Sequence, residues 1–190
     1  MALSPRQLAV SVIAAALLAV LAMAVASPPP AAAASACKAW GKTTPDQLRN
    51  GQARKAVLCL INRRRDAAGL PDLRRNKQLQ KAAQRHNDRM DGTGCFAHEC
   101  PGEPALDVRL DDYLTGGLSR WGIGENVAWG SGEHGTPEAI VQAWMNSPGH
   151  RANILSRDWR EIGVGFSAGS PTSGRADAGI YTTDFGLRVG

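Results

Sequence analysis

Three side chains that could move protons or hold a metal ion lie in the middle of the chain: His98, Glu125 and His150. They stand 27 and 25 residues apart, far more than the spacing of a local metal-binding motif. These residues can therefore meet only through the tertiary fold. Two imidazoles and a carboxylate in one cleft could transfer protons, or His98 and His150 could ligate a divalent metal such as zinc. Glu125 would accept the second ring N–H of a neighbouring imidazole and fix its tautomer.

Two other histidines are given different roles. His86 lies three and four residues after Ala83 and Ala82 on the apolar face of a predicted helix, so we expect a buried, hydrogen-bonded core residue. His134 lies between Gly130 and Gly135, and we expect it to be solvated.

The elements that must position the three side chains follow from periodicity and from helix-end signals. Apolar residues recur at spacings of three and four in the first half, Asn76 and Thr136 are predicted N-caps, and Ser147-Pro148 starts one further helical piece. The predicted helices are 46–68, the segment after Asn76, the segment after Thr136 and that after Ser147, and 106–114 is predicted to be a short helical or irregular piece. The predicted strands are 126–129, the alternation around 162–166, and 179–187. This order predicts an α+β domain.

The N-terminal segment is typical of an exported protein. Residues 1–26 combine Arg6, an apolar run from Leu8 and the A-x-A site Ala24–Ala26, which indicates a signal peptide. The alternatives are an uncleaved anchor, or a lipoprotein modified at Cys37. We expect a secreted protein that meets the membrane only through this segment before cleavage. Residues 27–44 are predicted to be a Pro/Ala-rich linker and extension, and 45–190 the domain.

The four cysteines of such a protein predict disulfides rather than reactive thiols. Three pairings are possible. Cys95 and Cys100 are five residues apart in a loop with Gly and Pro, which favours a local bridge and leaves Cys37 with Cys59. The local bridge would hold the loop that carries His98.

The charge pattern gives no sign of nucleic-acid binding. The formal net charge is +5, with one positive charge in the predicted signal peptide, and it favours anionic surfaces only weakly. The run Arg63–Arg65 is expected near a helix C-terminus, where cations complement the helix dipole, and no aromatic stacking platform lies beside it.

The motifs FAHECPG (96–102), GENVAWG (124–130), SPGHRANIL (147–155) and EIGVGF (161–166) resemble, in wording and order, those of the CAP superfamily. This group contains cysteine-rich secretory proteins, insect venom antigens and plant pathogenesis-related proteins, and the chain is most similar to the bacterial secreted branch. The resemblance covers about 54–187. It implies a three-layer α–β–α sandwich with a small antiparallel sheet, the CAP fold.

The resemblance also implies a cleft with two histidines and two glutamates. His98, Glu125 and His150 match three of these positions. The second glutamate, expected three residues after Trp144, falls on Ser147, which could bind a ligand but is better explained as a helix cap. The departure weakens the interpretation as a metallopeptidase.

Two classes of function are compatible with such a cleft. The first is a binding module for a small or lipid-like ligand, a cell-wall component or a partner protein. The alternative is a metal-assisted hydrolase or peptidase that uses His98, Glu125 and His150, with zinc as a possible cofactor. The sequence holds no HExxH motif and no cysteine nucleophile. Binding is therefore favoured, and no catalytic residue is assigned.

Overall fold

The computed structural model describes residues 31–172 and 174–190, so the predicted signal peptide lies outside the described residues. Helices and strands alternate along most of this part of the chain. In order, they are α1 (Ala31–Trp40), η1 (Pro45–Gln47), α2 (Asn50–Asp66), β1 (Arg74–Arg75), α3 (Lys77–Thr93), α4 (Leu106–Arg109), α5 (Asp111–Leu114), β2 (Arg120–Ser131), η2 (Gly132–Gly135), α6 (Pro137–Asn146), α7 (Pro148–Leu155), β3 (Glu161–Ala168) and β4 (Ala178–Val189). The mixed helix-and-strand class predicted from the sequence is confirmed.

The four strands form one sheet in the order β1-β3-β4-β2. Strands β3 and β2 both pair antiparallel with β4, while the two-residue β1 pairs parallel with β3. The small antiparallel sheet that was expected is present as β3-β4-β2, and β1 adds a parallel pair at its edge, so the whole sheet is mixed. The two residues of β1 could not be recognised as a strand because they show no alternation and are both exposed arginines.

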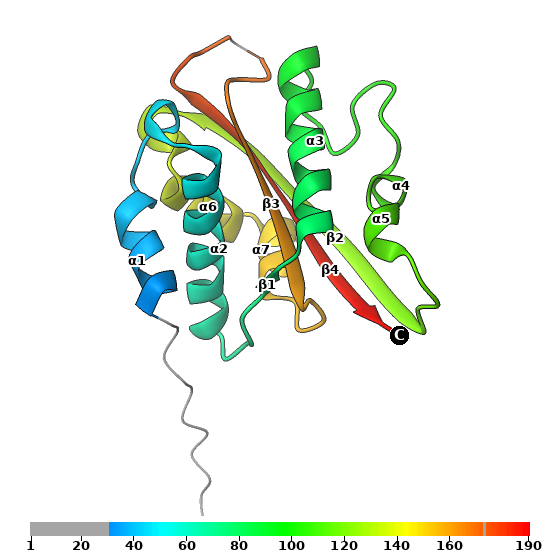
Figure 1. The fold of residues 1–190 in the computed structure, drawn as a ribbon. Coiled ribbons are helices and arrows are strands. Elements are labelled where there is room, and N and C mark those ends of the chain that lie inside the picture. The colour runs from blue at the N-terminus through cyan, green and yellow to red at the C-terminus, as the bar shows by residue number, and fades with distance from the viewer. Residues whose placement is uncertain (1–30, 173) are drawn as a thin grey trace, which may run out of the picture.

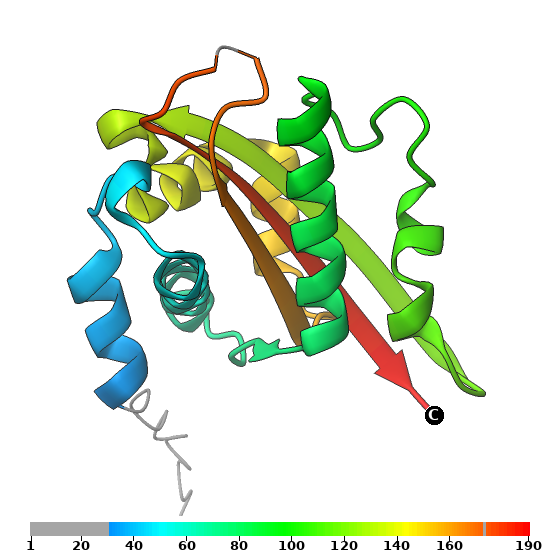
Figure 2. The same ribbon diagram turned by 45° about the horizontal axis from the view of Figure 1, so that its top comes forward.

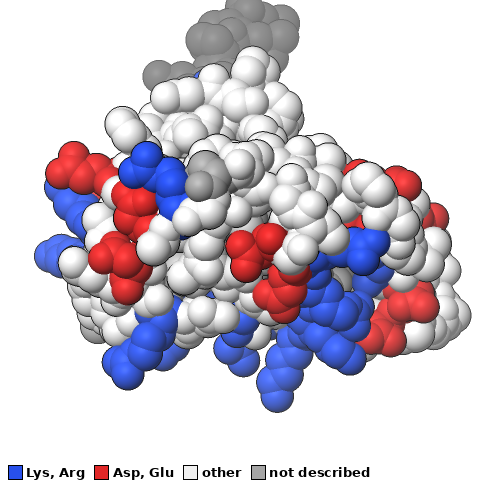
Figure 3. Space-filling model, turned by 90° about the horizontal axis from the view of Figure 1, so that it is seen from above, with Lys and Arg blue, Asp and Glu red and all other residues white. Residues whose placement is uncertain are grey.

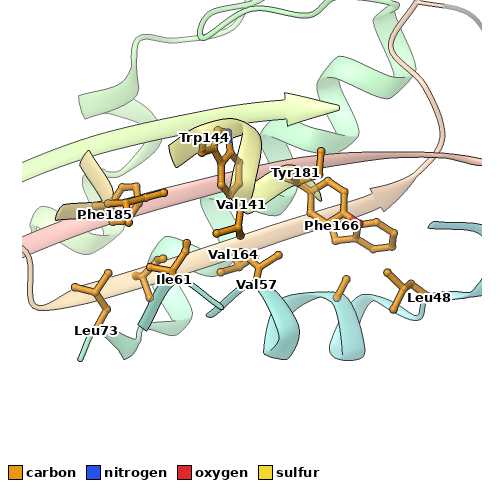
Figure 4. Close-up of a cluster of buried hydrophobic side chains, with 14 residues drawn as sticks. Leu48, Val57, Ile61, Leu73, Val141, Trp144, Val164, Phe166, Tyr181 and Phe185 are labelled. Carbon is orange, nitrogen blue, oxygen red and sulfur yellow. The ribbon is translucent and has the colours of Figure 1, made fainter. Parts of the chain in front are cut away.

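One face of the sheet packs against α2, α6 and α7. The main apolar core lies here, and Figure 4 shows side chains of α2 and α6 converging on β3 and β4. Its largest members are Trp144, Phe166, Tyr181 and Phe185, all at most 1% exposed. Burial of aromatic groups of this size accounts for a large part of the hydrophobic stabilisation of a domain.

The other face of the sheet is covered by α3, with α4 and α5 beside it. Figures 1 and 2 show α3 on one side of the strands and α7 on the other. Helix α3 approaches β3 so closely that a side chain at Gly163 would overlap the backbone of Leu79 and Gln80, and one at Gly165 that of Ala83. The three-layer α–β–α arrangement is thus confirmed, and two glycines permit its close contact.

The helix-end signals are confirmed at two positions and wrong at a third. Asn76 caps α3, its Oδ1 accepting from the amides of Gln78 and Leu79, and Thr136 caps α6 through the amide of Ala139. The first long helix, expected from residue 46, begins at Asn50, because η1 forms a separate turn before it.

The segment predicted as a linker and extension, 27–44, contains the whole of helix α1. Ala36 and Cys37 of α1 are 5% and 7% exposed and pack against Cys59 and Leu60 of α2. Helix formation is understandable because alanine, the strongest helix former, fills this segment. The packed unit therefore extends N-terminal to residue 45.

Both predicted disulfides are present, Cys37–Cys59 and Cys95–Cys100. The first joins α1 to α2, and the second closes the loop between α3 and α4. Within the residues that the structure describes, there is no helix long and apolar enough to cross a membrane.

Candidate functional site

Glu125 lies in the middle of β2, and its side chain is only 2% exposed. The sequence suggested a turn followed by a strand from residue 126, but β2 already begins at Arg120 and pairs with β4 along its whole length. Gly122 and Gly124 concealed this part of the strand, since glycine is rare in strand interiors. Glycine is needed at both positions because a side chain there would press against the ring of Trp159.

His98 lies in the loop after α3, which the Cys95–Cys100 disulfide closes. Its Nδ1 is 2.8 Å from Oε1 of Glu125, while 59% of its side-chain surface is exposed. The hydrogen bond to Glu125 raises the pKa of His98 against the opposing effect of burial. With Nδ1 held by the carboxylate, Nε2 has no hydrogen-bond partner among the described residues.

His150 approaches from the other side of the sheet, on α7. The amide of Asn126 donates to the backbone carbonyl of His150 at 3.1 Å, and Asn153 donates to the carbonyl of Glu125 at 3.1 Å. Strand β2 is at the edge of the sheet, and its successive residues Glu125 and Asn126 point to opposite faces. His98 and His150 therefore approach β2 from opposite faces. Burial and the charge of His98 lower the pKa of His150, so the two rings are electrostatic neighbours.

The position of α7 is determined by a buried arginine. Arg65 of α2 is fully buried and donates through Nη1 to the carbonyls of Ile154 and Ser156 at 2.8 and 2.9 Å. These carbonyls belong to the last residue but one of α7 and to the residue that follows it, so the arginine satisfies acceptors that a helix end leaves free. The arginine therefore ties the helix that carries His150 to the core.

Ser147 occupies the N-cap position of α7, as predicted, but its side chain makes no capping hydrogen bond. Proline at the next position already lacks an N–H, which leaves fewer amides to cap. The predicted capping by the Ser147 hydroxyl was therefore wrong, and a ligand contact stays a prediction.

A second layer of ionisable side chains lies beneath Glu125. His86 is fully buried, as predicted, with Nδ1 2.8 Å from Oε1 of Glu103 and Nε2 3.0 Å from the carbonyl of Ala97. Arg109 of α4 lies 3.0 Å from Oε2 of Glu125 and 3.8 Å from Oε1 of Glu103. Burial raises the pKa of Glu125, but the His98 hydrogen bond and the Arg109 charge outweigh it, so the net shift is downward.

Glu103 is a second glutamate of this cluster, although the position expected for one, three residues after Trp144, holds Ser147. Its side chain is 8% exposed, and it comes from the same loop as His98 rather than from the end of α6. Sequence reasoning also missed Arg109 and Asp184. The sequence signal that could have revealed this cluster is Asp184, an acidic residue inside the predicted strand 179–187. In the structure, the first ten residues of that strand, β4, are all buried.

This geometry bears on the metal site predicted at His98 and His150. Glu125 engages Nδ1 of His98 instead of pointing beside it into the cleft, and the described residues contain no group of three or more His, Cys, Asp or Glu side chains arranged to hold an ion. A catalytic zinc normally takes three protein ligands and one water. The side chains present do not match such a site, and binding by His98 and His150 alone stays a prediction.

Comparison with known proteins agrees with this architecture. Residues 58–185 match the model of the cysteine-rich secretory protein family, CAP. The uncharacterized protein YkwD of Bacillus subtilis is 39% identical over 114 residues, which are 59% of this chain and 41% of that protein. The uncharacterized membrane protein YlbC of the same organism is 31% identical over 58% of this chain and 30% of its own length. The chain thus spans less than half of these curated relatives.

Solved structures show the same fold. An extracellular protein containing a SCP domain from Bacillus anthracis has a TM-score of 0.57 at 27% identity, over 72% of this chain and 40% of that one. An outer surface protein from Borrelia burgdorferi has a TM-score of 0.59 at 21% identity, over 71% and 92% of the two chains, and this likeness shows the fold alone. With the family match covering most of the described residues, the chain belongs to the cysteine-rich secretory protein (CAP) family.

Proposed function

We propose that this protein is an exported binding domain whose cleft between His98 and His150 takes the polar end of a small or lipid-like ligand. The observation that carries the proposal is the arrangement of the two imidazoles. Glu125 holds Nδ1 of His98, while Nε2 of His98 and the ring of His150 have no hydrogen-bond partner among the described residues. Polar groups left open on a disulfide-braced frame are available to a ligand.

The two rings differ in their tendency to hold a proton. The pKa of His98 is raised and that of His150 is lowered, so near neutral pH His98 is the ring that favours the cationic form. A cationic N–H donor beside a neutral imidazole suits a carboxylate or phosphate group. Ligands with an acidic head are therefore the favoured class.

Apolar surface beside the site supports a lipid-like body for the ligand. Phe96, two residues before His98, leaves 40% of its surface exposed. An open groove of about 360 Å³ also lies along α6 and α7, lined by Met145, Asn146, Pro148, Arg151, Ala152 and Leu155. Within α7, however, the groove residues Pro148, Arg151, Ala152 and Leu155 recur at three and four and form the outer face of the helix, while His150 lies on the side toward β2. The groove is therefore a second apolar surface, separate from His150.

Native mass spectrometry and thermal shift would test the proposal. The protein would be collected from the medium of a secreting host without chelators, where we expect a chain starting at Ser27. Amphiphiles with carboxylate, phosphate or uncharged heads would then be added, and acidic ones should raise the melting temperature by mass action. An added divalent metal lost in His150→Ala would instead favour the hydrolase alternative.

Two variants locate the binding. The double variant His98→Ala/His150→Ala should weaken binding of the acidic amphiphile at least about tenfold, the effect of losing one or two hydrogen bonds to a charged group. His134→Ala removes an exposed histidine on η2 and should bind like the wild type. Equal affinity of the double variant and the wild type would show that the cleft is not the binding site.

A further inference from the structure

Asp184 of β4 is a buried acid that no part of the proposed function uses. It lies directly opposite Glu125 in the antiparallel pairing of β2 and β4, and its side chain is fully buried. Opposite residues on one face have Cβ atoms about 4.5–5.5 Å apart. Two carboxyl groups thus share one buried space, where two negative charges would repel each other strongly.

Few hydrogen-bond donors reach the carboxyl oxygens of Asp184 and Glu125. Within the described residues, no hydrogen bond reaches either oxygen of Asp184 or Oε2 of Glu125. Arg109 Nη2 forms an ion pair with Oε2 at 3.0 Å and gives one of its two hydrogens to the carbonyl of His98 at 2.9 Å, so it leaves both oxygens of Asp184 without a donor. A buried carboxyl group with both oxygens unpaired, directly opposite another buried carboxyl group, indicates that one of the two carries a proton.

The charges around the pair lead to the same conclusion. Both ring nitrogens of His86 face oxygens that only accept, from Glu103 and Ala97, so the His86–Glu103 pair carries one proton more than a neutral ring and a carboxylate. That pair then has no net charge. Arg109 remains as the buried cation beside Glu125 and Asp184, because the His98 side chain is largely exposed to solvent. One shared proton then makes the buried part of the cluster neutral.

We propose that Asp184 is a proton-holding positioning residue whose carboxyl O–H donates a hydrogen bond to Oε2 of Glu125. Glu125 is then held from three directions: by Asp184 and Arg109 at Oε2, and by His98 at Oε1. The consequence for the cleft is a fixed orientation of the His98 ring. The assignment deepens the proposed function, because it concerns the same cleft, but it is tested without any ligand.

The electrostatics of the two acids are in accord with this assignment. Burial raises the pKa of Asp184 well above its ordinary value, the Glu125 carboxyl raises it further, and Arg109 opposes the shift only partly. Glu125 shifts in the opposite direction. Neighbouring carboxyl groups whose pKa values move apart are the expected behaviour of a pair that holds one proton.

Infrared spectroscopy at neutral pH decides the protonation state. The folded wild type should show the C=O stretch of a protonated carboxylic acid, and Asp184→Asn should lose it. Asp46→Asn, which changes an exposed aspartate, should keep it. Absence of the band from the wild type, or its persistence in Asp184→Asn, would overturn the proposal.

The titration of the His98 imidazole, followed by NMR, tests the positioning role. In Asp184→Asn the amide can still donate to Oε2 and no charge changes, so the His98 titration midpoint should stay where it is. In Asp184→Val the donor is lost, and the midpoint should fall. A lower midpoint in Asp184→Asn would mean that Asp184 is ionised in the wild type, which contradicts the proposal. Failure of Asp184→Val to fold leaves the infrared result and the Asn variant to decide, and failure of every ligand to bind would affect only the proposed function.

Discussion

Glu125 contacts two different partners at this site, one through each carboxylate oxygen. One of its oxygens accepts from His98, and the other lies beside Arg109 at 3.0 Å. The side chains of Glu125 and Arg109 are 2% and 7% exposed, so neither charge can turn to water if its partner is removed. The residue that orients the exposed imidazole is therefore also part of the buried charge balance.

Glu125→Gln should destabilise the fold and lower the His98 titration midpoint. Breaking a buried ion pair from one side costs about 3–5 kcal/mol, because the remaining charge is buried and unpaired. Chemical denaturation would measure the stability, and NMR the midpoint. Glu99→Gln, next to His98 but exposed, is the control and should change stability by no more than about 0.5 kcal/mol. Equal stability of the two variants would mean that the Glu125–Arg109 contact does not matter energetically.

Because of Asp184, the free energy of unfolding should decrease as pH rises over part of the pH range. Its folded-state pKa lies above its ordinary value of 3.8, so between these two values the folded state binds one proton more than the unfolded state. Its contribution is complete below the unfolded pKa and is lost as pH rises through the folded pKa, at about 1.4 kcal/mol per pH unit. Denaturation curves of the wild type and Asp184→Asn across pH would show this as a difference in slope; parallel curves would contradict it.

At the scale of elements, the layers come together through close backbone contacts and covered strand edges. Helix α3 lies against β3 at Gly163 and Gly165. The free edge of β2 is covered by side chains of α6 and α7, since Trp144 donates to the carbonyl of Val127 at 3.1 Å and Asn153 to that of Glu125. Such covering protects an edge strand from pairing with another chain. It also holds α7, the helix that carries His150, against β2.

Gly163→Ala should be clearly destabilising, because the added methyl group would overlap the backbone of Leu79 and Gln80. Overpacking of this kind costs about 1–3 kcal/mol, and more where backbone must move. Gly51→Ala is the matched control. This helical glycine has no atom within 4 Å of the new methyl group, so the variant should gain about 0.5–1 kcal/mol. Thermal denaturation would compare them, and a neutral Gly163→Ala would show that α3 can move away from the sheet.

The two disulfides should differ in their effect on the site. Replacing Cys37 and Cys59 by alanine should cost about 3 kcal/mol, and replacing Cys95 and Cys100 about 2 kcal/mol, by loop entropy. The second change frees the loop of His98, so it alone should move the His98 midpoint toward its ordinary value. Denaturation and NMR of the two double variants check this. An unchanged midpoint without the Cys95–Cys100 bridge would mean that Glu125 is sufficient to hold His98.

At the scale of the whole molecule, the surface charge is unevenly distributed. Figure 3 shows Lys and Arg gathered along one side of the molecule, with Asp and Glu mostly beside and above them. Lys77, Lys81 and Arg85 contribute exposed cations at successive turns of α3. Like charges at this spacing destabilise a helix slightly, so the arrangement is not explained by helix stability.

Weak, salt-sensitive adsorption to anionic vesicles should follow from this distribution. The attraction should be strong at low ionic strength and nearly lost at 1 M salt, where the screening length is about 3 Å. Vesicle co-sedimentation across salt would measure it, with Lys77→Gln/Lys81→Gln expected to bind less and Lys42→Gln, an exposed lysine before η1, to bind like the wild type. Adsorption that does not depend on salt would point to apolar contacts instead.

Local signals made much of the fold predictable. The caps at Asn76 and Thr136, the alternation around Val164 and both disulfides depend on residues close in sequence or on a small set of pairings, and all are confirmed. Helix α1 and the full length of β2 were missed. In β2, Gly122 and Gly124 hide the strand pattern. Glycine is needed at these positions because the ring of Trp159, more than thirty residues further along the chain, packs over them.

The sequence by itself determined the family, the main helices and strands, and three residues that could form a cleft. Only the tertiary structure decided that His98 and Glu125 share a hydrogen bond, and that Glu103, Arg109 and Asp184 lie beneath them. The physical reason is that periodicity and caps report the partners of a residue within a few turns or along one strand. A buried charge finds its partner across layers, and Asp184 meets Glu125 only because β2 and β4 pair in this register.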